Sequence, residues 1–82
     1  SSVFPNPFNP TTNIEFELFS DSNVSLSVYN INRGLVDEIV SEYMNSGVYD
    51  FVWDASSYSS GVYFIQIKTD FEVQTSKLML LK

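Results

Sequence analysis

Apolar and polar side chains alternate along most of the chain. Between residues 12 and 19, Ile14, Phe16 and Leu18 are separated by single polar residues. The same alternation recurs in three later stretches, at residues 24–29, 48–53 and 62–68. Successive side chains of a β-strand point to opposite faces, so a period of two predicts strands that are buried on one face. Runs rich in Asn, Ser, Asp and Gly lie between these stretches and predict turns.

Residues 35–43 have a less regular pattern. Val36, Ile39, Val40 and Tyr43 fall at positions i, i+3, i+4 and i+7, a spacing that also fits one face of a short helix. The segment is short, and strands are expected on both sides of it. We therefore expect a regular or irregular strand here, with a helix as the alternative.

The two ends of the chain differ in composition. Residues 1–10 hold all three prolines and are expected to form an extended lead-in at a sheet edge, anchored by Phe4 and Phe8. Residues 71–82 are expected to form the last strand, which a tight hairpin at residues 69–70 joins to the strand before it.

Six or seven short strands separated by turn signals predict an all-β fold. The expected architecture is an immunoglobulin-like antiparallel β-sandwich of about seven strands, in one domain that spans residues 1–82. A chain of this length buries only about 60% of the surface that its unfolded form exposes, so it holds one thin core. We expect Trp53, the only tryptophan, to lie in that core.

The composition argues against several classes of function. The chain has no cysteine and no histidine, which removes thiol nucleophiles and histidine proton transfer. Ten acidic residues against four basic ones give a net charge of −6, so no basic surface is expected to meet the phosphates of nucleic acid. The sequence contains neither an apolar run of about 18 residues nor a basic n-region followed by an apolar h-region. If the protein is exported, its signal peptide is expected on a longer parent chain.

The acidic residues offer only weak candidates for chemistry. Glu15 and Glu17 share one face of a predicted strand about 7 Å apart, which overlaps the carboxylate spacing of glycosidases. The other face of that strand is apolar, so these residues are better explained as its solvated side. Asp21, Asp54 and Asp70 fall in predicted loops without the spacing of a calcium-binding loop, and turn formation explains them better. We expect no catalytic, cofactor-binding or metal-binding residues.

Aromatic residues offer an alternative function if they are exposed, although aromatic residues scattered through a sandwich usually belong to its core. Tyr43, Tyr58, Phe64 and Phe71 are candidates for a platform that stacks on sugars or on a protein. The alternative is therefore a carbohydrate-binding or adhesive module of a secreted multidomain protein.

Three segments together resemble the type A C-terminal sorting domains of the type IX (Por) secretion system. Residues 4–12 read FPNPFNPTT, which is similar to the start of that family. Residues 53–54 read WD and are followed at 60–64 by SGVYF, as in the middle of the family. The end, residues 77–82, reads KLMLLK and is similar to the family's terminal segment. The order and spacing fit over essentially the whole chain.

Two local departures from the family pattern concern turns. The family usually shows Asn-x-x-Gly after its second strand, whereas here Gly34 stands four residues after Asn30. Ala55 stands where the family has Gly after Trp-Asp.

The resemblance implies a non-catalytic sorting signal that directs a fused N-terminal cargo domain across the outer membrane. The implied partners are the outer-membrane type IX translocon and a sortase-like peptidase, which cleaves near the N-terminal side of the domain. The implied location is secreted or at the cell surface, reached via the periplasm. The residues carried over from the family's motifs are Pro5, Asn6, Pro7, Gly61, Val62, Tyr63, Lys77, Leu78, Met79, Leu80, Leu81 and Lys82.

The last strand allows two compatible interpretations. Its backbone edge and apolar side chains can be bound by a receptor through strand addition, with Lys77 and Lys82 giving orientation. Alternatively, Leu78 to Leu81 complete the core and the lysines protect an edge. A purely structural sandwich, like the immunoglobulin-like part of flagellar hook-capping proteins, is a third reading of the fold.

Overall fold

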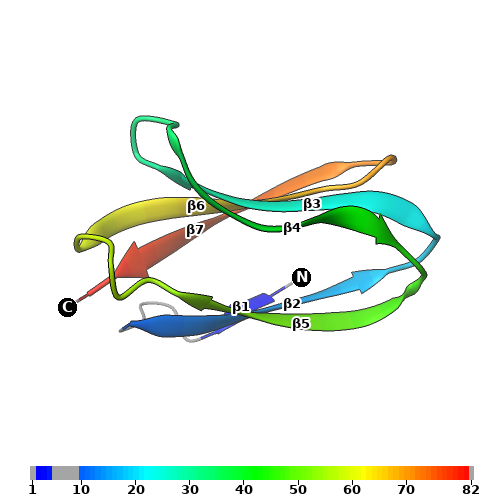
Figure 1. The fold of residues 1–82 in the computed structure, drawn as a ribbon, viewed down its shortest axis with the longest axis horizontal. Helices are drawn as coiled ribbons and strands as arrows, with labels where there is room; N and C mark the ends of the chain where they lie inside the picture. The colour runs from blue at the N-terminus through cyan, green and yellow to red at the C-terminus, as the bar shows by residue number, and fades with distance from the viewer. Residues whose placement is uncertain (1, 5–9, 82) are drawn as a thin grey trace.

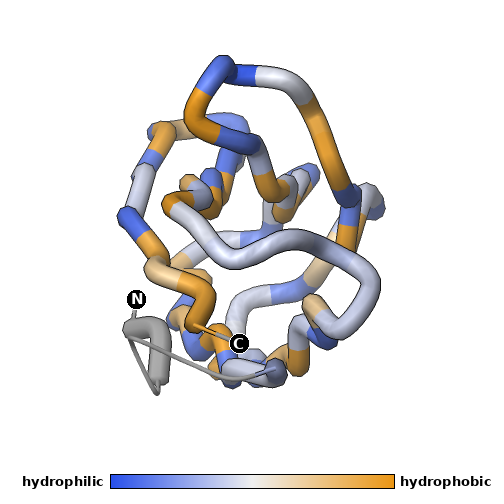
Figure 2. Tube along the Cα trace, turned by 90° about the vertical axis from the view of Figure 1, so that its left-hand side faces the viewer, coloured by the Kyte–Doolittle hydropathy of each residue, from blue (hydrophilic) through white to orange (hydrophobic). Residues whose placement is uncertain are grey.

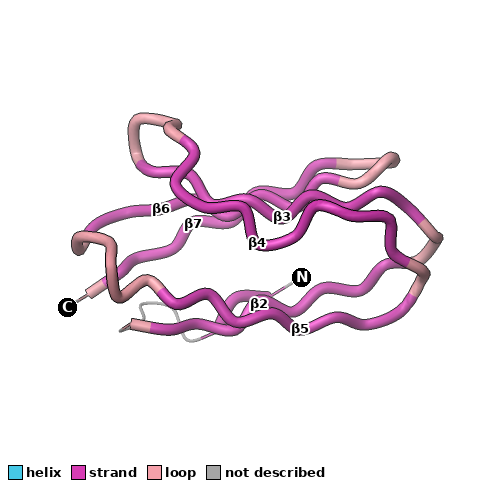
Figure 3. Tube along the Cα trace, viewed as in Figure 1, coloured by secondary structure: helices cyan, strands magenta, loops and turns pink. Residues whose placement is uncertain are grey.

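The computed structural model describes residues 2–4 and 10–81. In this part of the chain all regular structure is β-strand, and no helix is long and apolar enough to cross a bilayer (Figure 3). The strands are β1 (Ser2–Phe4), β2 (Thr11–Leu18), β3 (Ser22–Asn30), β4 (Leu35–Met44), β5 (Gly47–Asp54), β6 (Gly61–Lys68) and β7 (Val73–Leu80).

The strands form two antiparallel sheets that face each other (Figure 1). One sheet has the order β1-β2-β5 and the other has the order β4-β3-β6-β7. The predicted all-β sandwich is confirmed, with six strands of eight to ten residues and a β1 of only three. Strand β1 pairs with β2 at the sheet edge, where the lead-in was expected. Phe8 and the side chain of Phe4, predicted as anchors, lie outside what the structure describes.

The period of two in the sequence corresponds to the burial pattern of the strands. In β2, Thr12, Ile14, Phe16 and Leu18 are buried and the residues between them are exposed. Figure 2 shows this alternation as short segments of opposite hydropathy along the trace. Strand β2 therefore gives one face to the space between the sheets and the other to solvent.

Strand β4 is an irregular strand, as its pattern predicted, and the helical alternative is wrong. Its pairing with β3 skips Ile39, because Leu26 pairs with Val40 and the next residue, Ser27, pairs with Glu38. It also skips Val36, because Val28 pairs with Asp37 and Tyr29 pairs with Leu35. Two such register shifts place Ile39 and Val36 against the core. A β-bulge inserts one extra residue and breaks the period of two, so inward residues follow a spacing that imitates a helix.

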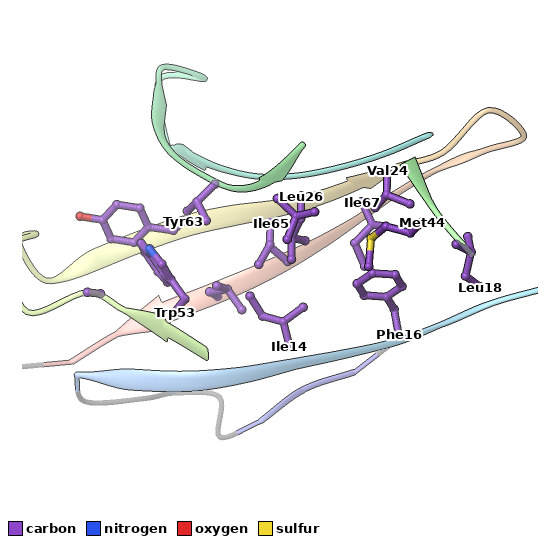
Figure 4. Packing of buried hydrophobic residues seen from close by; sticks show 14 of the residues in the cluster. Ile14, Phe16, Leu18, Val24, Leu26, Met44, Trp53, Tyr63, Ile65 and Ile67 are labelled. Carbon is purple, nitrogen blue, oxygen red and sulfur yellow. The ribbon is translucent and has the colours of Figure 1, made fainter. Parts of the chain in front are cut away.

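The core lies between the sheets and is entirely made of strand and turn side chains (Figure 4). Trp53 is only 2% exposed, which confirms its predicted place. It packs against Tyr58 and Tyr63 at ring-centroid distances of 5.6 Å in both cases. Toward the other end of the sandwich, Phe16 stacks with Tyr49 at 5.6 Å. Buried aromatic rings carry much of the stability of so small a core.

The hairpin between β6 and β7 is longer than predicted. The connection occupies residues 69–72, and β7 begins at Val73, so Phe71 is in the turn and exposed. Thr69 explains the difference, because its Oγ1 accepts hydrogen bonds from the backbone N–H groups of Phe71 and Glu72, both at 3.1 Å. A threonine side chain that bonds its own backbone favours a turn over a continued strand.

Candidate functional site

Two segments of the predicted sorting signal, far apart in the sequence, lie side by side in the structure. One begins β6 and the other ends β7, and these strands are antiparallel neighbours. The register brings together three pairs of predicted residues: Gly61 with Leu80, Val62 with Met79, and Tyr63 with Leu78. Lys77 lies opposite Phe64, one step further along. Leu81 directly follows the end of β7 and is exposed, whereas Pro5, Asn6, Pro7 and Lys82 lie outside the described part of the chain.

The inward side chains of these segments build the core. Tyr63, Leu78 and Leu80 are all buried. The Tyr63 hydroxyl donates a hydrogen bond of 2.6 Å to the backbone oxygen of Ser59, and its ring meets the edge of Trp53 (Figure 4). Residues from the SGVYF and WD segments therefore contact each other directly. Their first task is structural, because a buried Tyr needs both packing and a partner for its hydroxyl.

The outward side chains of the same segments are accessible to a partner. Met79 is 39% exposed and Leu81 is 50% exposed, although both belong to an apolar run. Strand β7 is also an edge strand, since it has a neighbour in the sheet on one side only. An edge strand offers unpaired backbone groups that can accept a further strand. The last strand thus contributes to the core with one face and leaves side chains of its other face accessible.

Gly61 begins β6 with a backbone angle that ordinary residues avoid. Its φ is 152°, and a Cβ added there would meet no atom within 4 Å. The reason for glycine at this position is therefore backbone conformation, not lack of space.

The loop aspartates all accept backbone N–H groups, but only Asp54 does so within its own turn, as predicted, whereas Asp21 and Asp70 bond residues distant in the sequence. The Asp21 carboxylate accepts from the backbone N–H of Ser46 at 2.8 Å. The hydroxyl and the backbone N–H of Ser56 both donate to Asp54 and hold the pKa of that carboxyl below its ordinary value. At the far end of the sandwich, Asp70 accepts from the backbone N–H of Asn23 at 3.1 Å, which likewise lowers the pKa of Asp70.

The described residues offer little to support chemistry. They include no group of three or more His, Cys, Asp or Glu side chains that could hold a metal ion. Glu15 and Glu17 are exposed on the outer face of β2, as expected of a solvated side.

Tyr58 has a raised pKa, first because of burial and then because of the nearby charge of Asp37. Its hydroxyl donates a hydrogen bond of 2.8 Å to the backbone oxygen of Val36.

The four aromatic residues considered for a platform do not gather in one place. Tyr43 is exposed near the end of β4, opposite Asn23. Tyr58 packs against Trp53 in the core. Phe71 borders a hollow at the open end of the sandwich, next to Phe19. Phe64 borders a different hollow on the outer face of the four-stranded sheet, where its neighbour is Tyr29. The sequence pattern did not predict that Phe64 pairs with Tyr29. It placed both residues only among the outward-facing positions of their strands.

Comparison with models of protein families identifies the family of this chain. The model of the secretion system C-terminal sorting domain matches the chain from residue 2 to residue 81. The chain is a member of this family. The resemblance seen in the three sequence segments is thereby confirmed over nearly the whole length. No curated protein matches the chain.

Membership of this family establishes the general role of the domain. It is a C-terminal sorting signal of type IX secretion, so it interacts with the machinery of that system. The protein that carries it is secreted or exposed at the surface. Sorting domains of this family are generally non-catalytic.

Proposed function

We propose that residues 1–82 act as one sorting unit that directs a covalently fused N-terminal cargo from the periplasm through the outer-membrane type IX translocon. In this proposal a sortase-like peptidase then cleaves near the N-terminal side of the domain, in or before the proline-rich lead-in. The family match carries the general role.

The pairing of β6 with β7 supports a specific recognition element. Val62 and Met79 lie opposite each other on the outer side of the hairpin, and Leu81 follows at the exposed end. The machinery would bind these apolar side chains together as one exposed surface. Because the inner side of the same hairpin is core, only a folded domain presents the outer residues in this arrangement.

The experiment fuses the sorting domain to a secreted reporter in a bacterium that has the type IX pathway. The variant Met79→Ser with Leu81→Ser changes the outer side chains and leaves Leu78 and Leu80 in place. We expect the reporter to accumulate in the periplasm while the melting temperature of the purified domain is unchanged. The matched control is Val48→Ser with Val52→Ser, because these two valines are exposed on β5, in the other sheet.

The outcomes separate the parts of the proposal. If the wild-type domain does not export the reporter, the sorting role is wrong for this chain. If both double variants are exported like the wild type, the outer side of the hairpin is not the recognition element. The mass of the exported reporter tests cleavage, and a reporter that keeps the whole domain contradicts it.

A further inference from the structure

We infer that the outer face of the four-stranded sheet, near the turn between β3 and β4, is a docking surface for an acidic protein segment with an apolar side chain. This inference rests on the proposed function and concerns a second contact with the export machinery, away from the edge of β7.

A single row of side chains crosses all four strands on this face. The register places Leu35 opposite Tyr29, Tyr29 opposite Phe64, and Phe64 opposite Lys77. The row starts on β4 and passes over β3 and β6 to β7. It begins with an exposed aliphatic residue, continues with two partly exposed aromatic rings, and ends with a cation.

The row borders a hollow, which we call the Tyr29–Phe64 groove. Its volume is about 660 Å³, and it is lined by Tyr29, Ile31, Arg33, Phe64, Gln66 and Thr75. Exposed Ile31 and Leu35 stand at the turn, and Met79 lies beyond Phe64 on β7. Aromatic residues, methionine and arginine are the types enriched at protein–protein interfaces. The aliphatic residues around the groove favour an apolar protein side chain over a sugar ring.

The turn that carries Arg33 is held in place by its own hydrogen bonds. The side-chain Oδ1 of Asn30 accepts from the backbone N–H of Asn32 at 2.9 Å and from that of Gly34 at 2.8 Å. The backbone N–H of Arg33 donates to the backbone oxygen of Asn30 at 3.0 Å. This turn rises from the outer side of the four-stranded sheet, away from the other sheet (Figure 1). A fixed turn positions the guanidinium at the groove before a partner binds, which lowers the entropic cost of binding.

Arg33 has an unusual backbone for its residue type. Its φ is 66°, in the left-handed region that asparagine and glycine adopt more readily. The conformation therefore does not explain why arginine stands at this position. Among the described residues, the Arg33 side chain forms neither a hydrogen bond nor an ion pair. Its five N–H donors are available to a carboxylate, which guanidinium binds in a bidentate geometry.

The distribution of charge over the two sheets specifies the sign of the partner. The described cations are Arg33, Lys68 and Lys77, and all three lie on the outer side of the four-stranded sheet. The outer face of the other sheet instead carries Glu15, Glu17 and Asp50. On the row that crosses the groove there is no carboxylate, although Glu38 lies on the next row, opposite Ser27, and Glu42 and Asp70 lie beside Lys68 further along the sheet. Arg33 and Lys77 are therefore the cations that face the groove without a neighbouring carboxylate on the same row. Charge complementarity of this kind selects an acidic partner and orients it.

The first test is export of the reporter. The variant Arg33→Glu reverses the charge at the groove, and we expect export to fall roughly tenfold through lost attraction and new repulsion. The control, Val48→Glu with Val52→Glu, makes the same change in net charge on the opposite face and is expected to export normally. Both melting temperatures should match the wild type. If Arg33→Glu is exported as well as its control, the inference is wrong and the sorting role stands.

The second test uses the purified domain and defined probes in an NMR titration. The acidic peptide acetyl-Glu-Glu-Phe-Glu-Glu-amide should shift the amide signals of Tyr29, Arg33 and Phe64. Its lysine counterpart should bind more weakly, and Arg33→Glu should weaken binding of the acidic peptide roughly tenfold. Equal binding of both peptides, or shifts on the other sheet, would overturn the inference.

The same titration discriminates against other occupants. Shifts at the groove with a neutral polysaccharide and none with the acidic peptide would replace the inference by glycan binding. Shifts that grow with protein concentration alone would assign the groove to a second copy of the chain. Because these measurements need no export, they judge the groove even if the wild-type domain fails to export the reporter.

Discussion

The indole Nε1 of Trp53 donates a hydrogen bond of 3.0 Å to the carboxylate of Asp37. Trp53 is on β5 and Asp37 is on β4, so this bond joins an edge strand of one sheet to an edge strand of the other. Most of the described contact between the two sheets is apolar packing, which has no preferred direction. The bond therefore helps to fix how the sheets are aligned along this side of the sandwich.

Removing the acceptor tests this relationship. We expect Asp37→Ala to lower the free energy of unfolding by about 1–3 kcal/mol, because a buried N–H group loses its carboxylate partner. Asp37→Asn keeps an oxygen at nearly the same place and is expected to cost less than half as much. Urea unfolding, followed by Trp53 fluorescence, measures both. Equal losses for the two variants would show that the negative charge matters rather than the hydrogen bond.

Neighbouring residues of β7 should respond very differently to truncation. Leu78 is fully buried, whereas Met79 beside it points to the outer face. Leu78→Ala is expected to cost about 2–5 kcal/mol through lost burial and the cavity left behind. Met79→Ala should stay within about 0.5 kcal/mol of the wild type. Thermal unfolding of both variants checks the prediction, and similar losses would mean that β7 does not have the described orientation.

The stability of the domain should decrease in acid because of Asp70 and Asp54. The pKa values of both carboxyls are lowered in the folded state, chiefly by the backbone N–H of Asn23 for Asp70 and by the Ser56 hydroxyl for Asp54. A lowered folded pKa adds stability above the unfolded value, near 3.8, and this stability is lost as the pH falls through the folded pKa.

The variant Asp70→Asn isolates this effect. It removes one titrating group but keeps an oxygen that can accept from Asn23. Melting temperatures recorded from about pH 6 to about pH 2 should fall less steeply for Asp70→Asn than for the wild type. Asp21→Asn is the control, since it changes the charge of another loop carboxylate that also accepts a backbone N–H. Identical slopes for Asp70→Asn and the wild type would contradict the prediction.

Gly61 should tolerate no side chain, in spite of the open space around it. Its φ of 152° strains any residue with a Cβ, so we expect Gly61→Ala to cost about 1–3 kcal/mol. Ser57→Ala, at an exposed position in the preceding loop, is the control and should have little effect. Chemical denaturation of both variants provides the measurement. If Gly61→Ala unfolds together with its control, glycine at this position serves recognition and not conformation.

Local patterns in the sequence predicted most of the fold. Period-two alternation located β2, β3, β5 and β6, because each of these strands buries alternate side chains. The pattern was ambiguous only at β4, where Val36 and Ile39 are bulged residues. A bulge depends on the partner strand, so a single segment cannot reveal it. The turn at residues 69–72 was underestimated for a related reason, since the Thr69 side chain stabilises two additional residues outside the strand.

The site was harder to predict than the fold. Motif segments such as SGVYF and KLMLLK were recognised in the sequence, but their direct pairing is a property of the sheet order. The row from Leu35 to Lys77 depends on the register of three strand pairs at once. Alternation assigns Tyr29 and Phe64 to outer faces, yet it does not say that these faces belong to the same sheet.

The two borders of the four-stranded sheet are unequal. Strand β4, with its two bulges, presents a kinked backbone on one side, whereas β7 presents a regular one on the other. Bulges hinder the approach of a foreign strand. If a foreign strand pairs with β7, the opposite border at β4 is too irregular to pair with a further copy in the same way. End-to-end growth of a fibril through one sheet needs two regular borders, and the bulged border at β4 makes this sheet a poor unit for such growth.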